Sequence, residues 1–236
     1  MTYSELSPPS GGIVEARPAA AVVVVRDGPL GCETLLVLRN PQLSFHGGSW
    51  VFPGGRIDAE DLKSAAAPDD MVSAARVAAI REAKEEAAVD IEARDLVLFS
   101  RWITPEGLPK RFDAWYFAAA TRSEQVQVDG GEILDHRWMR PADAIAAHRA
   151  GEMDLPPPTW VTLHHFSAAN SAAAALDRAR SCQFDFFLPR LHWTSGGACA
   201  LYGGDAAYES GELECAGPRH RLWMIGGGWR YERDPR

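Results

Sequence analysis

Three glutamates, Glu82, Glu85 and Glu86, stand at offsets of zero, three and four residues within the run REAKEE. Side chains at these offsets lie on one face of an α-helix. Such a face can hold a divalent cation such as Mg²⁺, which prefers oxygen ligands and is usually bound by a few carboxylates. Upstream, segment 52–58 is a strand-like approach that ends in a turn formed by two adjacent glycines. Together the two segments predict a site for metal-dependent diphosphate chemistry.

The chemistry of diphosphate cleavage explains why these residue types matter. Cleavage requires that negative charge on phosphoryl oxygens be neutralised and that a nucleophile approach in line, and bound metal ions do both. Gly54 and Gly55 have no side chains, so the backbone there can approach a metal or a phosphate closely. Arg81 precedes Glu85 by four residues and can orient a carboxylate through charge-assisted hydrogen bonds. We therefore expect Arg81 to support the glutamates.

A solvated helix face is the simpler interpretation of the same glutamates. Glu and Lys are common on exposed helices, and like charges at these offsets cost only a few tenths of a kcal/mol. Repulsion therefore does not exclude this interpretation. The upstream glycine pair and the downstream segments described below favour the functional one, because they supply the context that a metal site needs.

Composition limits the classes of protein that fit. A chain of 236 residues with 46% hydrophobic content is ordinary globular material. The longest apolar run, 19–25, is too short to cross a bilayer, so we expect a cytoplasmic protein without a membrane partner. The net charge is −8 and no basic cluster is present, which argues against a long nucleic acid as partner. The four cysteines form no C-x-x-C pair and are expected to be free thiols.

The order of the expected elements alternates strands with helices. β-branched, aromatic and leucine-rich runs predict strands, and alanine-rich periodic segments predict helices. Strands are expected over 19–26, 34–39, 49–52, 96–103, 112–118, 133–139, 199–202, 221–225 and 229–231, and helices over 69–89, 141–150 and 159–180, the last being a second long helix. We expect a loose leader over 1–17, one domain over 18–180, and an extension over 181–236 that packs on the same domain.

The spacing of the glycines, acids and glutamates resembles a known family motif. Gly55, Asp61 and the segment 81–89 are similar to the Nudix box, in which a glycine, a glutamate and R-E-U-x-E-E-x-G-U follow one another at short intervals. Three departures stand out: Asp61 replaces the glutamate, the gap from Asp61 to Arg81 is longer than usual, and Ala88 replaces the last glycine. Ala88 would cost up to about 1 kcal/mol in a left-handed cap, a cost that a continued helix would avoid.

The long gap resembles one branch of this family. Nudix proteins with an expanded box include the peroxisomal coenzyme A diphosphatases, and the segments 101–105, 111–113 and 155–159 strengthen that resemblance. The resemblance covers about residues 18–180. It implies a Nudix-type α/β/α sandwich with a mixed β-sheet, here followed by a C-terminal extension.

The resemblance also assigns roles to individual residues. It implies that Glu82, Glu85 and Glu86 hold Mg²⁺ or Mn²⁺, that the carbonyl of Gly54 is a further ligand, and that Glu132 supplies an extra acid from a later loop. Glu82 is also the candidate for the residue that deprotonates or positions the attacking water, so Glu82 and Arg81 form the expected catalytic pair. Asp135 competes with Glu132 for the later position, and a turn carboxylate in solvent is the alternative for either.

Substrate contacts are expected from residues outside the box. Arg39, Arg101 and Arg111 can grip phosphates through their planar donor forks, although exposed arginines commonly form surface ion pairs instead. Phe112 is the aromatic candidate for substrate contact, although strand aromatics usually fill cores.

The resemblance implies an enzyme that hydrolyses a nucleoside diphosphate linked to another group. Coenzyme A or an acyl-coenzyme A is the favoured substrate. An ADP-sugar or a dinucleotide is the first alternative, and a catalytically silent nucleotide-binding sensor is the second. The intact glutamates argue against the sensor. The sequence leaves a homodimer open.

Overall fold

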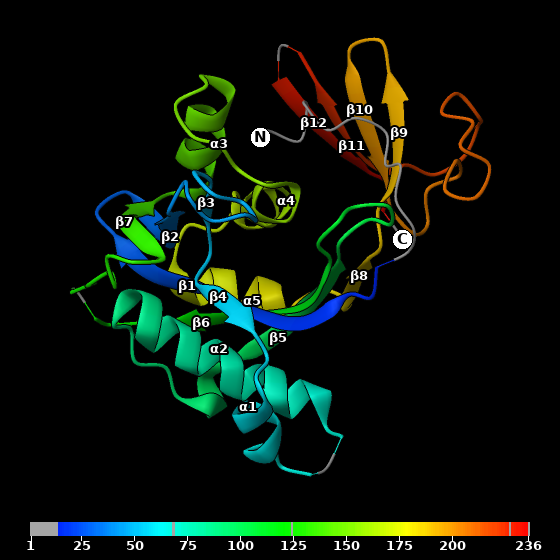
Figure 1. Cartoon of the computed structure of the whole chain (residues 1–236). Coiled ribbons are helices and arrows are strands. Elements are labelled where there is room, and N and C mark those ends of the chain that lie inside the picture. Colours follow the sequence, from blue (N-terminus) through cyan, green and yellow to red (C-terminus); the bar gives the residue numbers. More distant parts are fainter. Residues whose placement is uncertain (1–13, 68, 124, 227, 236) are drawn as a thin grey trace.

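A mixed β-sheet forms the centre of the molecule (Figure 1). The computed structural model describes residues 14–67, 69–123, 125–226 and 228–235. Six strands follow the order β3-β2-β1-β6-β5-β8, while β4 pairs with β1 and β7 pairs with β2. The strands are β1 (Arg17–Gly28), β2 (Gly31–Arg39), β3 (Trp50–Val51), β4 (Gly54–Arg56), β5 (Val97–Ile103), β6 (Phe112–Ala120), β7 (Ile133–Met139) and β8 (Asp185–Phe187). The pairs β1–β6 and β5–β8 are parallel, and the other pairs are antiparallel.

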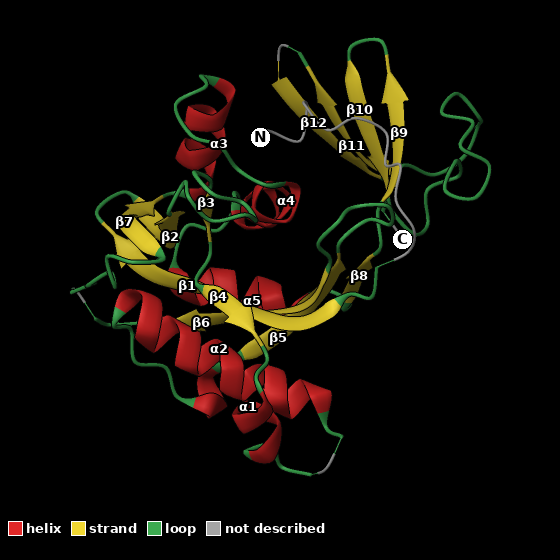
Figure 2. Cartoon of the chain, in the orientation of Figure 1, coloured by secondary structure: helices red, strands yellow, loops and turns green. Residues whose placement is uncertain are grey.

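Helices cover both faces of this sheet (Figure 2). The helix α2 (Met71–Ala87) packs on β1, β4 and β6, and α1 (Ala59–Lys63) lies against α2. On the opposite face, α5 (Ala172–Ser181) contacts β1, β2, β5 and β6, and α3 (Pro141–Arg149) packs on α4 (Pro157–Phe166). A short 3-10 helix, η2 (Ala93–Asp95), precedes β5. The expected α/β/α sandwich with a mixed sheet is confirmed.

The alternation of side chains along β1 explains the two helix layers. Val22 and Val24 join a core beneath α2, whereas Val23 and Val25 join a core on the α4 and α5 side. All four valines are fully buried because β1 is a central strand covered on both faces. The helix α2 turns a row of small alanines to the sheet, which allows close approach: Ala75, Ala78, Ala79, Ala83 and Ala87.

The C-terminal part of the chain contributes to both sheets. Its first strand, β8, extends the central sheet, and the next four form a separate antiparallel sheet in the order β12-β11-β10-β9 (Figure 1). These strands are β9 (Arg190–Thr194), β10 (Gly197–Leu201), β11 (His220–Ile225) and β12 (Gly228–Arg233). Ala198, Ala200 and Leu222 of this second sheet lie in the same apolar core as α4 and α5.

Several expected elements differ from those observed. The helix expected over 159–180 is wrong as a single element: it is broken between α4 and α5, where the Ser171 side chain caps α5 by accepting from the Ala174 N–H at 3.1 Å. The glycine pair expected as a turn forms strand β4. Neither α1 nor strands β8 and β9 was expected from the sequence. The expected leader over 1–17 lies outside the described residues except for 14–17, and β1 already begins at Arg17.

Membrane-spanning helices are absent from the part of the chain that the structure describes, since none of its helices combines the necessary length and apolarity.

Candidate functional site

Strand β4 lies directly against the glutamate face of α2. The Gly54 N–H donates to Glu86 Oε2 at 2.9 Å. A Cβ atom placed on Gly55 would lie 2.2 Å from Glu82 Oε1, and one on Gly54 would lie 2.4 Å from the Ala20 carbonyl oxygen. Both glycines are therefore needed for close approach, Gly55 to a carboxylate and Gly54 to the neighbouring strand β1.

Arg81 holds several acids with one guanidinium group. It donates to both oxygens of Asp61, at 3.1 and 2.8 Å, to Glu82 Oε1 at 2.8 Å and to Glu85 Oε2 at 3.0 Å. A further bond of 3.0 Å reaches the Arg56 carbonyl at the end of β4. The Asp61 carboxylate is buried and also accepts from the Asp58 N–H. Arg81 thus ties α1, β4 and α2 together and fixes the orientation of two of the three glutamates.

Arg39, at the end of β2, faces Glu86 and Glu132. Its Nη1 lies 3.6 Å from Glu86 Oε1 and its Nη2 lies 3.7 Å from Glu132 Oε2. The loop before β7 is anchored to Asn40, whose N–H donates to the Glu132 carbonyl at 2.8 Å and whose side chain donates to the Gly131 carbonyl at 2.8 Å. Asp135 lies on β7 opposite Leu38, and its carboxylate accepts from the adjacent His136 N–H. Of the two competing acids, Glu132 is therefore the one that Arg39 contacts.

Burial and repulsion shift the ionisation of the glutamates. Burial raises the pKa of Glu86 to about 8, and Glu82 and Glu132 add to this shift, while the Gly54 N–H and Arg39 oppose it. Burial also raises the pKa of Glu82, against the opposing effect of Arg81. A carboxylate with a raised pKa gains most from a nearby cation, because a cation favours its charged form.

The donor chemistry of the site fits a hard divalent ion. Every candidate ligand offers oxygen, as Mg²⁺ and Mn²⁺ prefer. Among the described residues, no three metal-ligating side chains converge on one point. The carboxylates of Glu82 and Glu85 are bonded to Arg81, and that of Glu86 is bonded to the Gly54 N–H. An ion at this site would compete with the arginines for the same carboxylate oxygens.

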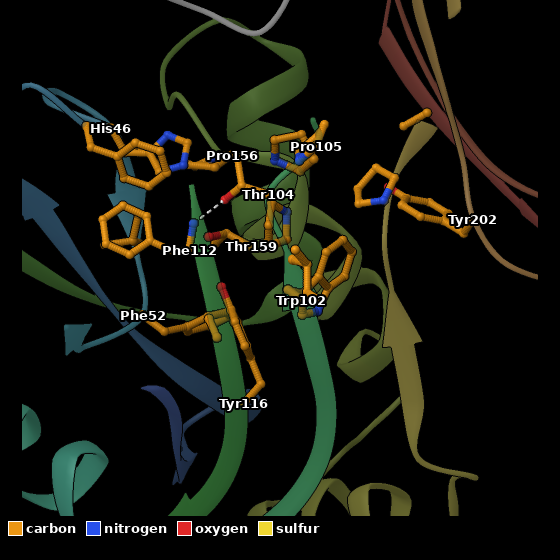
Figure 3. A pocket seen from close by; sticks show the side chains of 18 of the residues that line it. His46, Phe52, Trp102, Thr104, Pro105, Phe112, Tyr116, Pro156, Thr159 and Tyr202 are labelled. Atoms are coloured by element: carbon orange, nitrogen blue, oxygen red, sulfur yellow. Dashed lines mark hydrogen bonds between the residues drawn. The ribbon is translucent and has the colours of Figure 1, made fainter. Parts of the chain in front are cut away.

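A cavity of about 100 Å³, here called the aromatic cavity, is lined by residues of several elements (Figure 3). Phe52, which precedes Pro53 and Gly54 in the chain, lines it, and so does His46, whose pKa is lowered to about 4 by burial and by the charge of Arg39. Phe112 also lines the cavity, its ring lying 4.7 Å from that of Phe45, and its N–H donates to Thr104 Oγ1 at 3.0 Å. The remaining lining is mostly aromatic, proline and aliphatic.

The C-terminal sheet closes one side of the aromatic cavity. Leu191, Ala200 and Tyr202 belong to or follow strands β9 and β10, and all three line it. Tyr202 lies on the side of the cavity opposite Phe112 (Figure 3). Part of the cavity wall is therefore built by residues that lie more than 100 positions after the glutamates.

Two predicted substrate-binding arginines lie elsewhere. Arg101 forms two bonds to the Asp113 carboxylate, at 2.7 and 2.5 Å, and stacks over the Trp115 ring. Arg111 is buried and donates to the carbonyls of Thr104 and Val14. Neither residue lines the aromatic cavity or contacts the glutamates, so the geometry gives no support to a substrate role for them.

The comparison with known proteins decides the family. The sequence profile of the NUDIX domain matches residues 16–157, more than half of the chain. The chain belongs to the Nudix family. A crystal structure of a NUDIX hydrolase from Alicyclobacillus acidocaldarius superposes with a TM-score of 0.63 at 24% identity, covering 70% of this chain and 97% of that one. This likeness shows that the fold is the Nudix fold.

Two curated Nudix relatives are more distant. The chain is 25% identical over 191 residues to the Caenorhabditis elegans protein named "Putative nudix hydrolase 7", which covers 64% of this chain and 60% of that protein. It is 29% identical over 119 residues to the human "Acyl-coenzyme A diphosphatase NUDT19", which covers 47% of this chain and 31% of that protein. The chain therefore spans less than two thirds of either relative.

Sequence reasoning missed two features of this Nudix site. It gave Asp61 no role beyond a departure from the motif, yet the buried Asp61 carboxylate is the acid that Arg81 holds through two bonds. It also gave no role to His46, which lies between Phe45 and two glycines in a segment without a regular element. A histidine beside an aromatic residue in a loop is a weak signal, since nothing local shows that its ring lies near the charge of Arg39.

Proposed function

We propose that this Nudix protein hydrolyses a diphosphate linkage in a nucleoside diphosphate derivative, with Mg²⁺ or Mn²⁺ as cofactor. One observation carries the proposal: β4, Arg39 and Arg81 between them contact all four acids, Glu82, Glu85, Glu86 and Glu132. A structural role alone gives no reason to gather four acids there, because like charges repel.

Each residue of the site has a role in this proposal. Glu82, Glu85 and Glu86 would hold the ion, with the Gly54 carbonyl and Glu132 as further ligands. When bound, the ion neutralises charge on the phosphoryl oxygens and acidifies water. Glu82 accepts the proton of the attacking water, and Arg81 fixes the direction of the Glu82 carboxylate through its bond of 2.8 Å. Arg39 offers its planar donors to the substrate phosphates on the far side of Glu86.

Coenzyme A or an acyl-coenzyme A is the substrate that we favour. The similarity to the human acyl-coenzyme A diphosphatase supports this choice, and it extends over 31% of that protein. The aromatic cavity supports it independently, because its apolar lining suits a group that extends from the diphosphate away from the glutamates. In this proposal Phe112 and Tyr202 contact that group from opposite sides.

A single assay separates the candidate substrates. The protein is incubated with Mg²⁺ or Mn²⁺ and with coenzyme A, a long-chain acyl-coenzyme A, an ADP-sugar or a dinucleotide, and the products are identified by mass. The proposal predicts 3′,5′-ADP together with 4′-phosphopantetheine or its acyl form. Faster cleavage of the ADP-sugar or dinucleotide would select the first alternative. Binding without any turnover by folded protein would contradict the enzymatic proposal and favour the sensor.

A further inference from the structure

A second cavity, here called the polar cavity, shares Trp102 with the aromatic cavity. Its volume is about 420 Å³, within the range of small-molecule sites. Five elements build it: β5, β8, β12, α4 and the C-terminal end of α5. None of the four acids of the candidate active site lines it.

Three residues that line the polar cavity carry a buried polar atom without a hydrogen-bond partner among the described residues. These atoms are Ser100 Oγ, Trp102 Nε1 and His165 Nε2. Buried polar groups are normally hydrogen-bonded, and leaving them unpaired costs stability. Three residues in the wall of one cavity therefore have hydrogen-bonding capacity that no described residue satisfies.

The charge of the lining favours an anion. Arg233 bonds both oxygens of Asp185, each at 2.6 Å, so these two charges cancel. Arg178 is exposed at the edge of the cavity, and its side chain has no carboxylate within ion-pair distance in the described parts of the chain. Burial lowers the pKa of His165 to about 4, which leaves its ring neutral at pH 7. The lining therefore carries one net positive charge, on Arg178.

The apolar part of the cavity wall favours a ligand with a planar, apolar portion. Phe99, Val161 and Phe187 line the cavity, and the ring of His165 lies parallel to that of Phe99 at 6.2 Å with an interplanar angle of 7°. Flat aromatic faces pack against planar groups by offset stacking.

We propose that the polar cavity binds a small carboxylate with a flat apolar body. The carboxylate bonds to Arg178, to the Ser100 hydroxyl and to the Trp102 indole N–H. The planar body lies among Phe99, Val161 and Phe187. This inference does not depend on the proposed hydrolase activity because, apart from Trp102, its residues line neither the aromatic cavity nor the candidate metal site.

Binding of benzoate to the full-length protein tests the proposal. Titration calorimetry should show benzoate binding at least about tenfold more tightly than benzyl alcohol, which lacks the charge, and than acetate, which lacks the ring. The indole N–H resonance of Trp102, assigned with Trp102→Phe, should shift on addition of benzoate. Equal affinity for benzoate and benzyl alcohol, or an unmoved Trp102 resonance at saturating benzoate, would overturn it.

Two variants and a matched control sharpen the test. Arg178→Gln should weaken benzoate binding about tenfold or more, whereas Arg180→Gln, which removes an arginine of the same helix that pairs with Asp177, should leave it unchanged. Ser100→Ala should weaken binding while leaving the melting temperature unchanged or higher, because it removes an unpaired hydroxyl. Unchanged benzoate affinity in both Arg178→Gln and Ser100→Ala would contradict the proposed site.

Discussion

Two regions of this molecule bury charged groups, and they do so in opposite ways. In the C-terminal region, Arg221 and Asp205 form a pair whose side chains are 2% and 0% exposed. Arg221 donates to both oxygens of Asp205, at 2.8 and 2.6 Å, and to the Leu213 carbonyl at 2.8 Å. The backbone N–H groups of Ala207 and His220 each donate a further hydrogen bond to the Asp205 carboxylate. The charges balance, and both oxygens are satisfied.

In the region around α2, by comparison, acidic side chains outnumber the basic ones that contact them. Two arginines, Arg39 and Arg81, face six acids: Asp58, Asp61, Glu82, Glu85, Glu86 and Glu132. Although burial alone would raise the pKa of Asp205, the bonds from Arg221 and the backbone lower it. The pKa of Glu86 is instead raised to about 8. The Arg221–Asp205 pair is neutral as it stands, whereas an excess of acids is the arrangement that an added cation would stabilise, as the proposed function requires.

The largest effect is expected from breaking the balanced pair. Arg221→Met should lower the free energy of unfolding by about 3–5 kcal/mol, because it leaves the Asp205 carboxylate buried and unpaired. Denaturant unfolding measures this change. Arg190→Met, which breaks the exposed pair with Glu209, is the control and should change stability little. Equal losses of unfolding free energy in the two variants would mean that burial does not decide how strongly removal of the arginine destabilises the protein.

A substitution in the region around α2 should instead lower enzymatic activity and leave stability unchanged. Glu86→Gln should reduce turnover at least about 100-fold, because the amide offers a metal no charge. The melting temperature should not fall, since glutamine still accepts from the Gly54 N–H and a repelling charge is removed. Glu92→Gln, at an exposed pair with Arg94, is the matched control and should keep full activity. Retained turnover in Glu86→Gln would remove Glu86 from the proposed metal site.

A smaller effect is expected from displacing a glutamate without changing any charge. Gly55→Ala places a Cβ 2.2 Å from Glu82 Oε1, so the carboxylate must move away from strand β4. We expect turnover to fall about tenfold or more, since small misplacements of catalytic groups are costly. Gly203→Ala is the control, because a Cβ there meets nothing within 4 Å. Full activity in Gly55→Ala would show that the position of Glu82 tolerates adjustment.

A comparison of helix α2 with strand β4 shows which features of the structure the sequence can predict. The helix carrying the glutamates was predicted over 69–89 and is observed as Met71–Ala87, because periodicity and helix propensity are local properties. Strand β4 was not predicted. Its sequence, Gly-Gly-Arg, has low strand propensity, and its pairing comes from β1, whose residues 19–21 lie more than 30 positions earlier.

Distant contacts limited the other predictions. The break between α4 and α5 depends partly on Asp27, whose Oδ1 accepts from the Ala172 N–H at 2.7 Å across 145 positions. Arg39 was predicted as a phosphate contact, but its proximity to Glu86 and Glu132 requires β2, α2 and the loop before β7 to meet. The aromatic cavity likewise needs β9 and β10, which are distant in sequence from Phe112. Motif spacing located the glutamates, and tertiary packing decided what surrounds them.

The smallest effect concerns the end of the helix that carries the glutamates. Ala88 ends α2 with φ 54° and ψ 27°, so the helix does not continue and alanine takes the left-handed conformation that glycine adopts without strain. Ala88→Gly should raise the free energy of unfolding by about 0.5–1 kcal/mol, after allowing for the greater freedom of glycine in the unfolded chain. Denaturant unfolding should show the opposite sign for Ala150→Gly, because Ala150 ends α3 in a right-handed conformation with φ −74°. Turnover should stay unchanged in both variants. A loss of stability in Ala88→Gly would mean that the strain at this cap is relieved by contacts that alanine makes and glycine does not.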